Sequence, residues 1–85
     1  MTTTNTPEIA LIKLQARKTR DLCRDFALTG AMMDAAHAAG KSWDPELPTV
    51  RGWIMDEIER RDPEGFERWL DSDASDAAII RYIHC

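Results

Sequence analysis

The chain has 85 residues, of which 44% are hydrophobic and 31% are charged, and its net charge is −4. This length allows one domain of globular composition and excludes a large enclosed cofactor site, while the acidic balance argues against non-specific nucleic-acid binding. No apolar run approaches the roughly 18 residues that a membrane span needs, and the N-terminal residues lack the pattern of a secretory signal. Two cysteines, Cys23 and Cys85, are too few for a disulfide scaffold. We therefore expect a cytoplasmic protein with no membrane contact.

The first predicted element is a long helix that follows a polar tail. Residues 1–6 are expected to be a disordered tail, and Asn5 or Thr6 is expected to cap a helix over residues 7–28 with Pro7 in its first turn. Apolar residues recur there at helical spacing and share one side of the helix. This expected core face comprises Ile9, Leu11, Ile12, Ala16, Leu22, Cys23 and Phe26.

Two glycines bound the next predicted element. Gly30 is expected to end or kink the first helix, and Gly40 is expected to end a short Ala-rich helix over residues 31–39. Two prolines in residues 41–48 then predict an ordered loop that contains Trp43.

Two more helices are predicted in the middle of the second half. Thr49 is expected to cap a helix over residues 50–61, and Asp62 followed by Pro63 is a cap with proline at the first helical position of a helix over residues 63–70. The core residues expected from these two helices are Val50, Trp53, Ile54, Ile58, Phe66, Trp69 and Leu70.

A last helix is predicted after a break at residues 71–75, with Asp73 or Ser75 as its cap and Ala78, Ile79, Tyr82 and Ile83 on its apolar side. The sequence shows no strand alternation and no internal repeat. We therefore predict an all-α fold, a small orthogonal bundle of four to five helices that forms a single domain over residues 7–85.

Four basic residues give the most distinctive surface pattern. Lys13, Arg17, Arg20 and Arg24 are spaced 4, 3 and 4 apart, so they share one narrow face of the predicted first helix. Such a stripe suits phosphates or an acidic partner surface, but it is also the pattern of an ordinary solvated face. Trp43 has two interpretations as well: it closes the core as a lid, or it is an exposed anchor for a partner.

Charge is split between the two halves of the chain. Residues 1–52 hold seven Lys and Arg against six Asp and Glu, whereas residues 53–85 hold four against nine. The acidic face expected in the second half comprises Asp56, Glu59, Glu67, Asp71 and Asp73. Basic and acidic halves of opposite sign are compatible with a homodimer, and the acidic half is compatible with a decoy that mimics nucleic acid.

No pattern points to a catalytic, metal or cofactor site. Residues 71–76 begin like a calcium-binding loop, but Asp76 and Tyr82 stand where that loop needs Gly and Glu. Residues 49–54 weakly resemble the start of a DNA-recognition helix. However, the loop before them has about nine residues and the helix is acidic, whereas a helix-turn-helix has a short turn and phosphates repel acidic residues. We expect no enzyme, no metal and no cofactor.

The expected function is therefore that of a small non-catalytic adaptor or regulatory protein, which binds a protein partner through helical faces. The alternatives are a nucleic-acid-binding accessory protein that uses the four basic residues, and the acidic decoy. Arg outnumbers Lys by eight to three, which is typical of proteins from GC-rich bacterial genomes and favours a bacterial or phage accessory protein.

Overall fold

The computed structural model describes the backbone of residues 7–85 and the side chains from residue 12 onward. The expected polar tail over residues 1–6, with its cap at Asn5 or Thr6, lies outside the described residues. The described residues form four α-helices and one 3-10 helix and contain no strand, which confirms the predicted small all-α bundle. These helices are α1 (Pro7–Ala16), α2 (Thr19–Ala38), α3 (Glu46–Arg61), α4 (Pro63–Ser72) and the 3-10 helix η1 (Asp76–Arg81).

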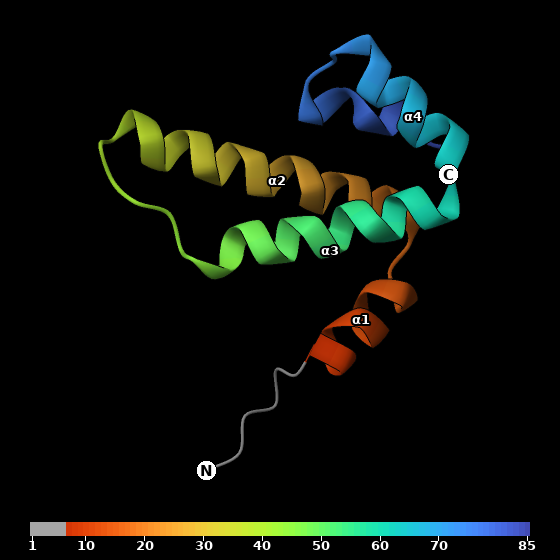
Figure 1. Cartoon of the computed structure of the whole chain (residues 1–85), viewed down its shortest axis with the longest axis horizontal. Helices are drawn as coiled ribbons and strands as arrows, with labels where there is room; N and C mark the ends of the chain where they lie inside the picture. Colours follow the sequence, from red (N-terminus) through yellow and green to blue (C-terminus); the bar gives the residue numbers. More distant parts are fainter. Residues whose placement is uncertain (1–6) are drawn as a thin grey trace.

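The helices are arranged around one antiparallel pair. Figure 1 shows α2 and α3 running side by side in opposite directions, with α4 and η1 on one side of the pair and α1 on the other. The molecule measures 42 × 33 × 16 Å along its principal axes.

The core lies where α2, α3, α4 and η1 meet. Its buried side chains are Leu22, Cys23, Phe26, Ile54, Ile58, Phe66, Trp69, Ile79 and Ile83. Phe26 and Trp69 pack edge to face, with their ring centroids 5.4 Å apart. Two expected core residues lie elsewhere, because Trp53 is only half-buried and Leu70 is exposed on the rim of α4. Ile12 and Ala16 are exposed as well.

The predicted helix over residues 7–28 is wrong in one respect: the chain breaks at Arg17 and Lys18, and α1 and α2 are separate helices. No glycine or proline stands at this break. A side chain from a distant part of the sequence lies at the break: Arg61 donates hydrogen bonds to the backbone carbonyls of Leu14, Gln15 and Arg17.

The predicted stop at Gly30 is also wrong, and the Ala-rich segment is the second half of α2 rather than a helix of its own. Gly30 is buried, and a Cβ atom there would overlap the carboxylate of Asp76. The glycine therefore permits close approach of η1 to α2 instead of ending the helix. The stop at Gly40 is confirmed: its φ is +69°, and the N–H of Lys41 donates to the carbonyl of Ala36, as in a Schellman motif.

α3 begins at Glu46, before the predicted cap at Thr49. Asp44 stabilises this earlier start, because its Oδ1 accepts from the N–H of Glu46 at 2.8 Å and its carbonyl accepts from the N–H of Leu47. Pro48 falls in the first turn of the helix, where the backbone needs no donor.

The predicted start of α4 is confirmed. Asp62 is the N-cap, its Oδ1 accepts from the N–H of Gly65 at 3.0 Å, and Pro63 is the first residue of the helix. α4 runs two residues beyond its predicted end, and Asp73 closes it with a φ of 57°. The last helix is a 3-10 helix, and Ser75 precedes it without a capping bond from its side chain. Among the residues described, no helix has both the length and the apolar character to cross a membrane.

Candidate functional site

The four basic residues of the predicted stripe do not lie on one helix face. Lys13 lies on α1, Arg17 lies in the break, and Arg20 and Arg24 lie on α2; all four are exposed. Arg17 is already paired, since its Nε lies 2.7 Å from Oδ2 of Asp25. The break in the helix divides the stripe, so the prediction of one continuous stripe is wrong.

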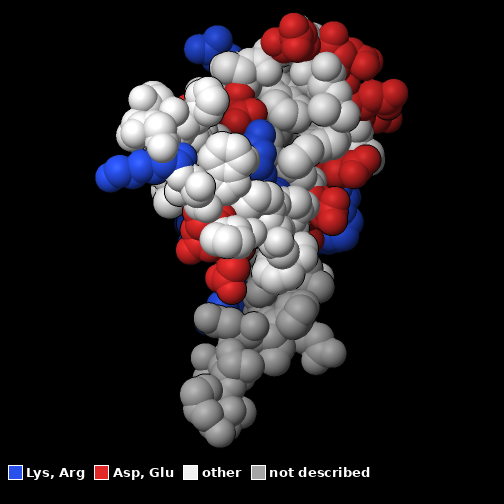
Figure 2. Space-filling model, turned by 60° about the vertical axis from the view of Figure 1, so that its left-hand side comes forward, with Lys and Arg blue, Asp and Glu red and all other residues white. Residues whose placement is uncertain are grey.

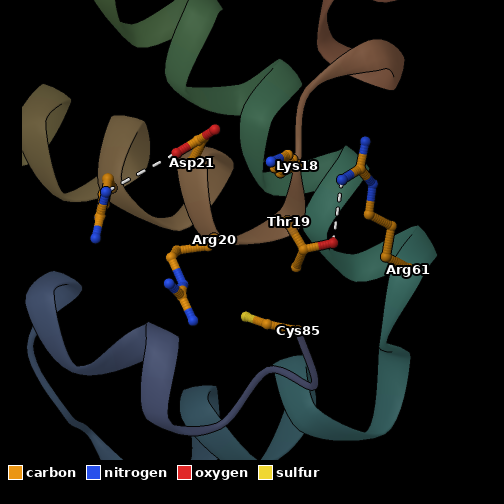
Figure 3. A pocket seen from close by; sticks show the side chains of 7 residues that line it. Lys18, Thr19, Arg20, Asp21, Arg61 and Cys85 are labelled. Atoms are coloured by element: carbon orange, nitrogen blue, oxygen red, sulfur yellow. Dashed lines mark hydrogen bonds and ion pairs between the residues drawn. The ribbon is translucent and has the colours of Figure 1, made fainter.

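Part of the basic charge does gather at the N-terminus of α2. An open pocket of about 640 Å³ lies there, and Figure 3 shows its lining side chains around the first turn of the helix. The lining residues are Lys18, Thr19, Arg20, Asp21, Arg24, Arg61 and Cys85. Arg24 is loosely paired with Asp21 at 4.0 Å. The excess of cations and the helix N-terminus both favour an anion at this place.

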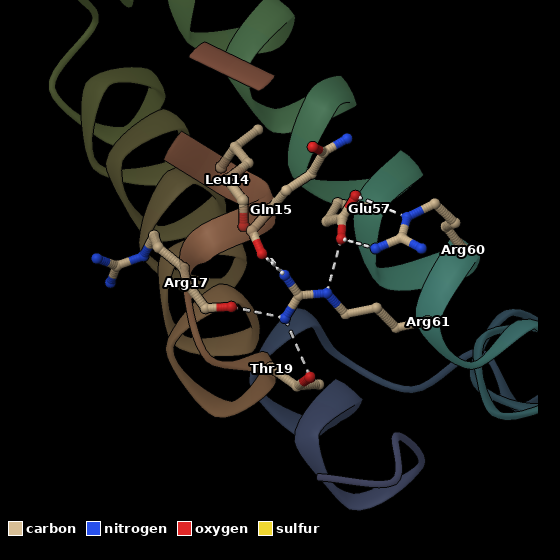
Figure 4. Close-up of polar contacts among 7 residues, drawn as sticks. All are labelled: Leu14, Gln15, Arg17, Thr19, Glu57, Arg60 and Arg61. Carbon is tan, nitrogen blue, oxygen red and sulfur yellow. Dashed lines mark hydrogen bonds and ion pairs between the residues drawn. The ribbon is translucent and has the colours of Figure 1, made fainter. Parts of the chain in front are cut away.

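Arg61 is not free to bind a ligand in this pocket. Its Nε donates to Oε2 of Glu57 at 2.7 Å, its Nη1 donates to the carbonyl of Arg17 and to Oγ1 of Thr19, and its Nη2 donates to two carbonyls of α1. All five N–H groups of the guanidinium are thus engaged within the chain, as Figure 4 shows. Arg61 therefore has a structural role between α3 and the break.

Glu57 is the acidic partner of this arginine. Its side chain is 6% exposed and also accepts two hydrogen bonds from Arg60, at 3.0 and 2.6 Å. The hydrogen bonds from Arg60, supported by those from Arg61 and opposed by burial, lower the pKa of the Glu57 carboxyl. The carboxylate accepts three hydrogen bonds from the two arginines, and these bonds stabilise its charged form.

A second internal arginine, Arg51, lies in residues 49–54, which weakly resemble the start of a DNA-recognition helix. Arg51 lies in α3 with its guanidinium 4.0 Å from the centre of the Phe26 ring. It donates to the carbonyl of Phe26, to the hydroxyl of Thr29 and to the carboxylate of Asp76. The one basic residue in residues 49–54 is therefore directed into the bundle rather than toward a partner.

The C-terminal half of α2 presents an uncharged face to solvent. The exposed residues on this face, which we call the α2 face, are Leu28, Ala31, Met32, Ala35, Ala38 and Ala39. Leu28 is 58% exposed and Met32 is 50% exposed, and one turn of helix separates them. Asp34 is the only Asp, Glu, Lys or Arg between Leu28 and Ala39. A surface helix normally has charged and polar residues on its solvent side.

Trp43 lies in the loop that follows α2 and is 40% exposed. It is not a member of the buried cluster, so it does not close the core as a fully buried lid would. Figure 2 is viewed from the side of this loop, and uncharged side chains fill the middle of that view.

The five residues of the predicted acidic face are all exposed. Asp56 and Glu59 lie on α3, Glu67 and Asp71 lie one turn apart on α4, and Asp73 closes α4. Figure 2 shows acidic side chains gathered at the top of the molecule, at the level that α4 and the turn after it occupy in Figure 1.

The two cysteines differ in their surroundings, and both are free thiols. Cys23 is 1% exposed, which confirms it as a small core residue, and burial, the main cause, raises the pKa of its thiol to about 11. Because the thiolate is the nucleophile, this thiol is inert at neutral pH. Cys85 is exposed at the edge of the basic pocket.

Comparisons with family models, curated proteins and solved structures find no match for this chain. The evidence for function therefore comes from its surfaces alone: the α2 face with Trp43, the basic pocket and the acidic residues.

Sequence reasoning missed the internal polar network altogether. The spacing of Glu57 to Arg60 and Arg61, three and four residues, is a visible signal for ion pairs on one helix. The pair Arg51–Asp76 joins residues 25 apart and has no local signal in the sequence.

Proposed function

We propose that this domain is a non-catalytic adaptor or regulatory protein that works in the cytoplasm and binds a protein partner through the α2 face. The exposure of Leu28 and Met32 together, among alanines, carries this proposal. Large contiguous apolar patches on soluble proteins mark sites of interaction.

The chemistry of the α2 face suits another helix. Two large side chains one turn apart form a ridge, and the neighbouring Ala31 and Ala35 allow the backbone of a partner helix to approach closely. Trp43 lies beyond the C-terminal end of the same helix and provides an aromatic anchor, a residue type enriched among interface hot spots. The expected partner therefore presents an apolar helix or a groove lined by apolar side chains.

The test is a comparison of three proteins immobilised as bait in extract of the native host: the wild type, the double variant Leu28→Glu with Met32→Glu, and Leu70→Glu. Leu70 is an equally exposed leucine on α4, at 52%, so its variant is the matched control. We expect the wild type and Leu70→Glu to retain the same partner and the double variant to lose it. A partner retained equally by the double variant contradicts the proposal. Thermal unfolding of all three checks that the charges leave the fold intact.

A second candidate function is nucleic-acid binding at the basic pocket. The observation that favours it is the gathering of Lys18, Arg20 and Arg24 around the N-terminus of α2. Binding of labelled DNA at low salt, followed by fluorescence anisotropy, should weaken steeply with added salt. It should be abolished by Arg20→Glu with Arg24→Glu but not by Leu28→Glu with Met32→Glu. No change in anisotropy at low salt would rule out this function.

A further inference from the structure

We propose that residues 17–18 are a hinge held bent by Arg61, and that α1 and α2 have a second state as one continuous helix over residues 7–38. This inference is independent of the proposed function and concerns a conformational change built into the fold. It rests on the break itself, on the hydrogen bonds of Arg61 and on the side chains that α1 leaves exposed.

The break is not encoded locally. The residues around it are Ala16, Arg17, Lys18 and Thr19, and the first three are among the best helix formers. Sharp kinks in helices are almost always found at proline, at glycine or where a side chain enters the backbone ladder. Here the side chain is that of Arg61, from the last turn of α3.

Arg61 occupies the acceptors that a continuous helix would use. In such a helix the carbonyls of Leu14, Gln15 and Arg17 accept from the backbone N–H groups four residues later. In the bent state all three accept from the guanidinium, at distances of 2.7 to 3.1 Å, and the carbonyl of Leu14 also accepts from the N–H of Arg17. The two arrangements satisfy the same carbonyls, so the break exchanges one set of hydrogen bonds for another rather than losing them.

The two states also use different sides of α1. In the bent state Leu14 packs against the core, whereas Ile12 is 65% exposed and Ala16 is exposed. In a continuous helix with 100° per residue, Ile12 and Ala16 fall on the same side as Leu22, Cys23 and Phe26. Those three residues are the buried side of α2. The apolar pattern therefore continues across the break, as it would in a single helix.

Straightening has a defined structural consequence. It withdraws α1 from α3, frees the guanidinium of Arg61 from the hinge and extends the apolar side of α2 toward its N-terminus. Glu57 keeps a partner in this state because Arg60 makes two hydrogen bonds of its own to the carboxylate. None of the nine residues of the buried cluster lies on α1: they come from α2, α3, α4, η1 and the segment after η1. The bundle therefore persists while α1 moves.

The test measures the distance between spin labels at positions 13 and 37 by pulsed electron resonance, in the full chain with Cys85→Ser and the substitutions Lys13→Cys and His37→Cys. Both positions are exposed, and Cys23 is too buried to react. A straight helix separates them by about 36 Å, from a rise of 1.5 Å per residue, and any bend between them shortens this distance.

Arg61→Ala is expected to move the main population from the shorter distance to about 36 Å. Arg60→Ala is the matched control, because Arg60 binds the same carboxylate but has no hydrogen bond to the hinge among the described residues; it should leave the distance unchanged. Lys18→Pro, added to Arg61→Ala, should remove the long distance: φ at Lys18 is −67°, which proline adopts, whereas proline inside a continuous helix breaks it.

The proposal is overturned if Arg61→Ala keeps the wild-type distance, or if its distances become broad while helical circular dichroism falls, since α1 has then unfolded rather than joined α2. Thr19→Ala is a milder second variant should Arg61→Ala fail to fold. It removes one acceptor of Arg61 and replaces a poor helix former with a good one, so it should raise the long-distance population in the folded protein. A distance distribution identical to that of the wild type would likewise count against the hinge.

Discussion

At the scale of single residues, two glycines stand at positions where neighbouring atoms leave no room for a side chain. A Cβ atom at Gly30 would overlap the carboxylate of Asp76, and one at Gly65 would overlap the carbonyl of Tyr82. Gly52, in contrast, has open space around the position of a Cβ atom. The first two glycines allow η1 and the segment after it to lie directly on α2 and α4, where Ile79 and Ile83 complete the core.

The substitution Gly30→Ala is expected to lower the free energy of unfolding by about 1–3 kcal/mol, because overpacking outweighs the better helix propensity of alanine. Gly52→Ala is the matched control and should raise it by about 0.5–1 kcal/mol, since only the propensity acts there. Urea unfolding followed by circular dichroism measures both. Equal effects of the two substitutions would show that the contact between Gly30 and Asp76 is not tight.

A further variant tests the overlap with Asp76 directly. Asp76→Ala, added to Gly30→Ala, should restore only part of the stability that Gly30→Ala loses, because it also leaves Arg51 without its carboxylate.

At the scale of secondary-structure elements, Asp62 joins three segments with one side chain. It caps α4 through Gly65, and its Oδ2 accepts from the N–H of His84 at 2.9 Å. These two backbone donors, with that of His84 first, lower the pKa of the Asp62 carboxyl. One carboxylate thus fixes both the start of α4 and the path of the chain after η1.

Asp62→Ala is expected to lower the free energy of unfolding, because α4 loses the side chain that caps its N-terminus. Asp71→Ala, at an exposed position on the same helix, should change it by less than about 0.5 kcal/mol. Amide hydrogen exchange should also show faster exchange at Gly65 and His84 in the first variant only. Unchanged protection at His84 would argue against its bond to Asp62.

The elements also show where sequence reasoning succeeds and where it fails. Local signals such as Asp62 with Pro63, or Gly40 after an alanine run, predicted helix ends correctly because capping depends on neighbouring residues. The break at residues 17–18 had no local signal, and the side chain that contacts its carbonyls, Arg61, comes from another helix. Gly30 gave a misleading signal, since its role is close packing. Because the break was not predicted, the four basic residues were expected on one helix face. The exposure of the α2 face was not predicted either.

At the scale of the whole molecule, two carboxylates couple stability to pH. The pKa values of Glu57 and Asp62 are lowered in the folded chain from 4.5 and 3.8, respectively. The unfolded chain therefore binds more protons in the acidic range, so the free energy of unfolding falls as the pH drops through these values and below. Above them, both groups are charged in either state and their contribution is constant.

Glu57→Gln is expected to flatten the acid limb of the stability curve between about pH 5 and 2, because one group with a lowered pKa has been removed. Its stability at neutral pH should also be lower, since an uncharged amide binds Arg60 and Arg61 less well. Chemical unfolding across this pH range measures both effects. Glu59→Gln, at an exposed position on the same helix, is the control. If the free energy of unfolding of Glu57→Gln falls with pH as steeply as that of the wild type, the pKa of Glu57 is not lowered in the folded chain.

The position of Ile79 and Ile83 in the core has a consequence for synthesis of the chain. α2 is complete once Ala38 has been added, but Phe26 on its buried side also needs side chains that come after α4. During synthesis the apolar side of α2 can therefore be covered first by α3 and α4, and it is fully covered only once the segment with Ile79 and Ile83 is available. A nascent chain that stops before this segment would hold a helix whose buried side is still partly open to chaperones.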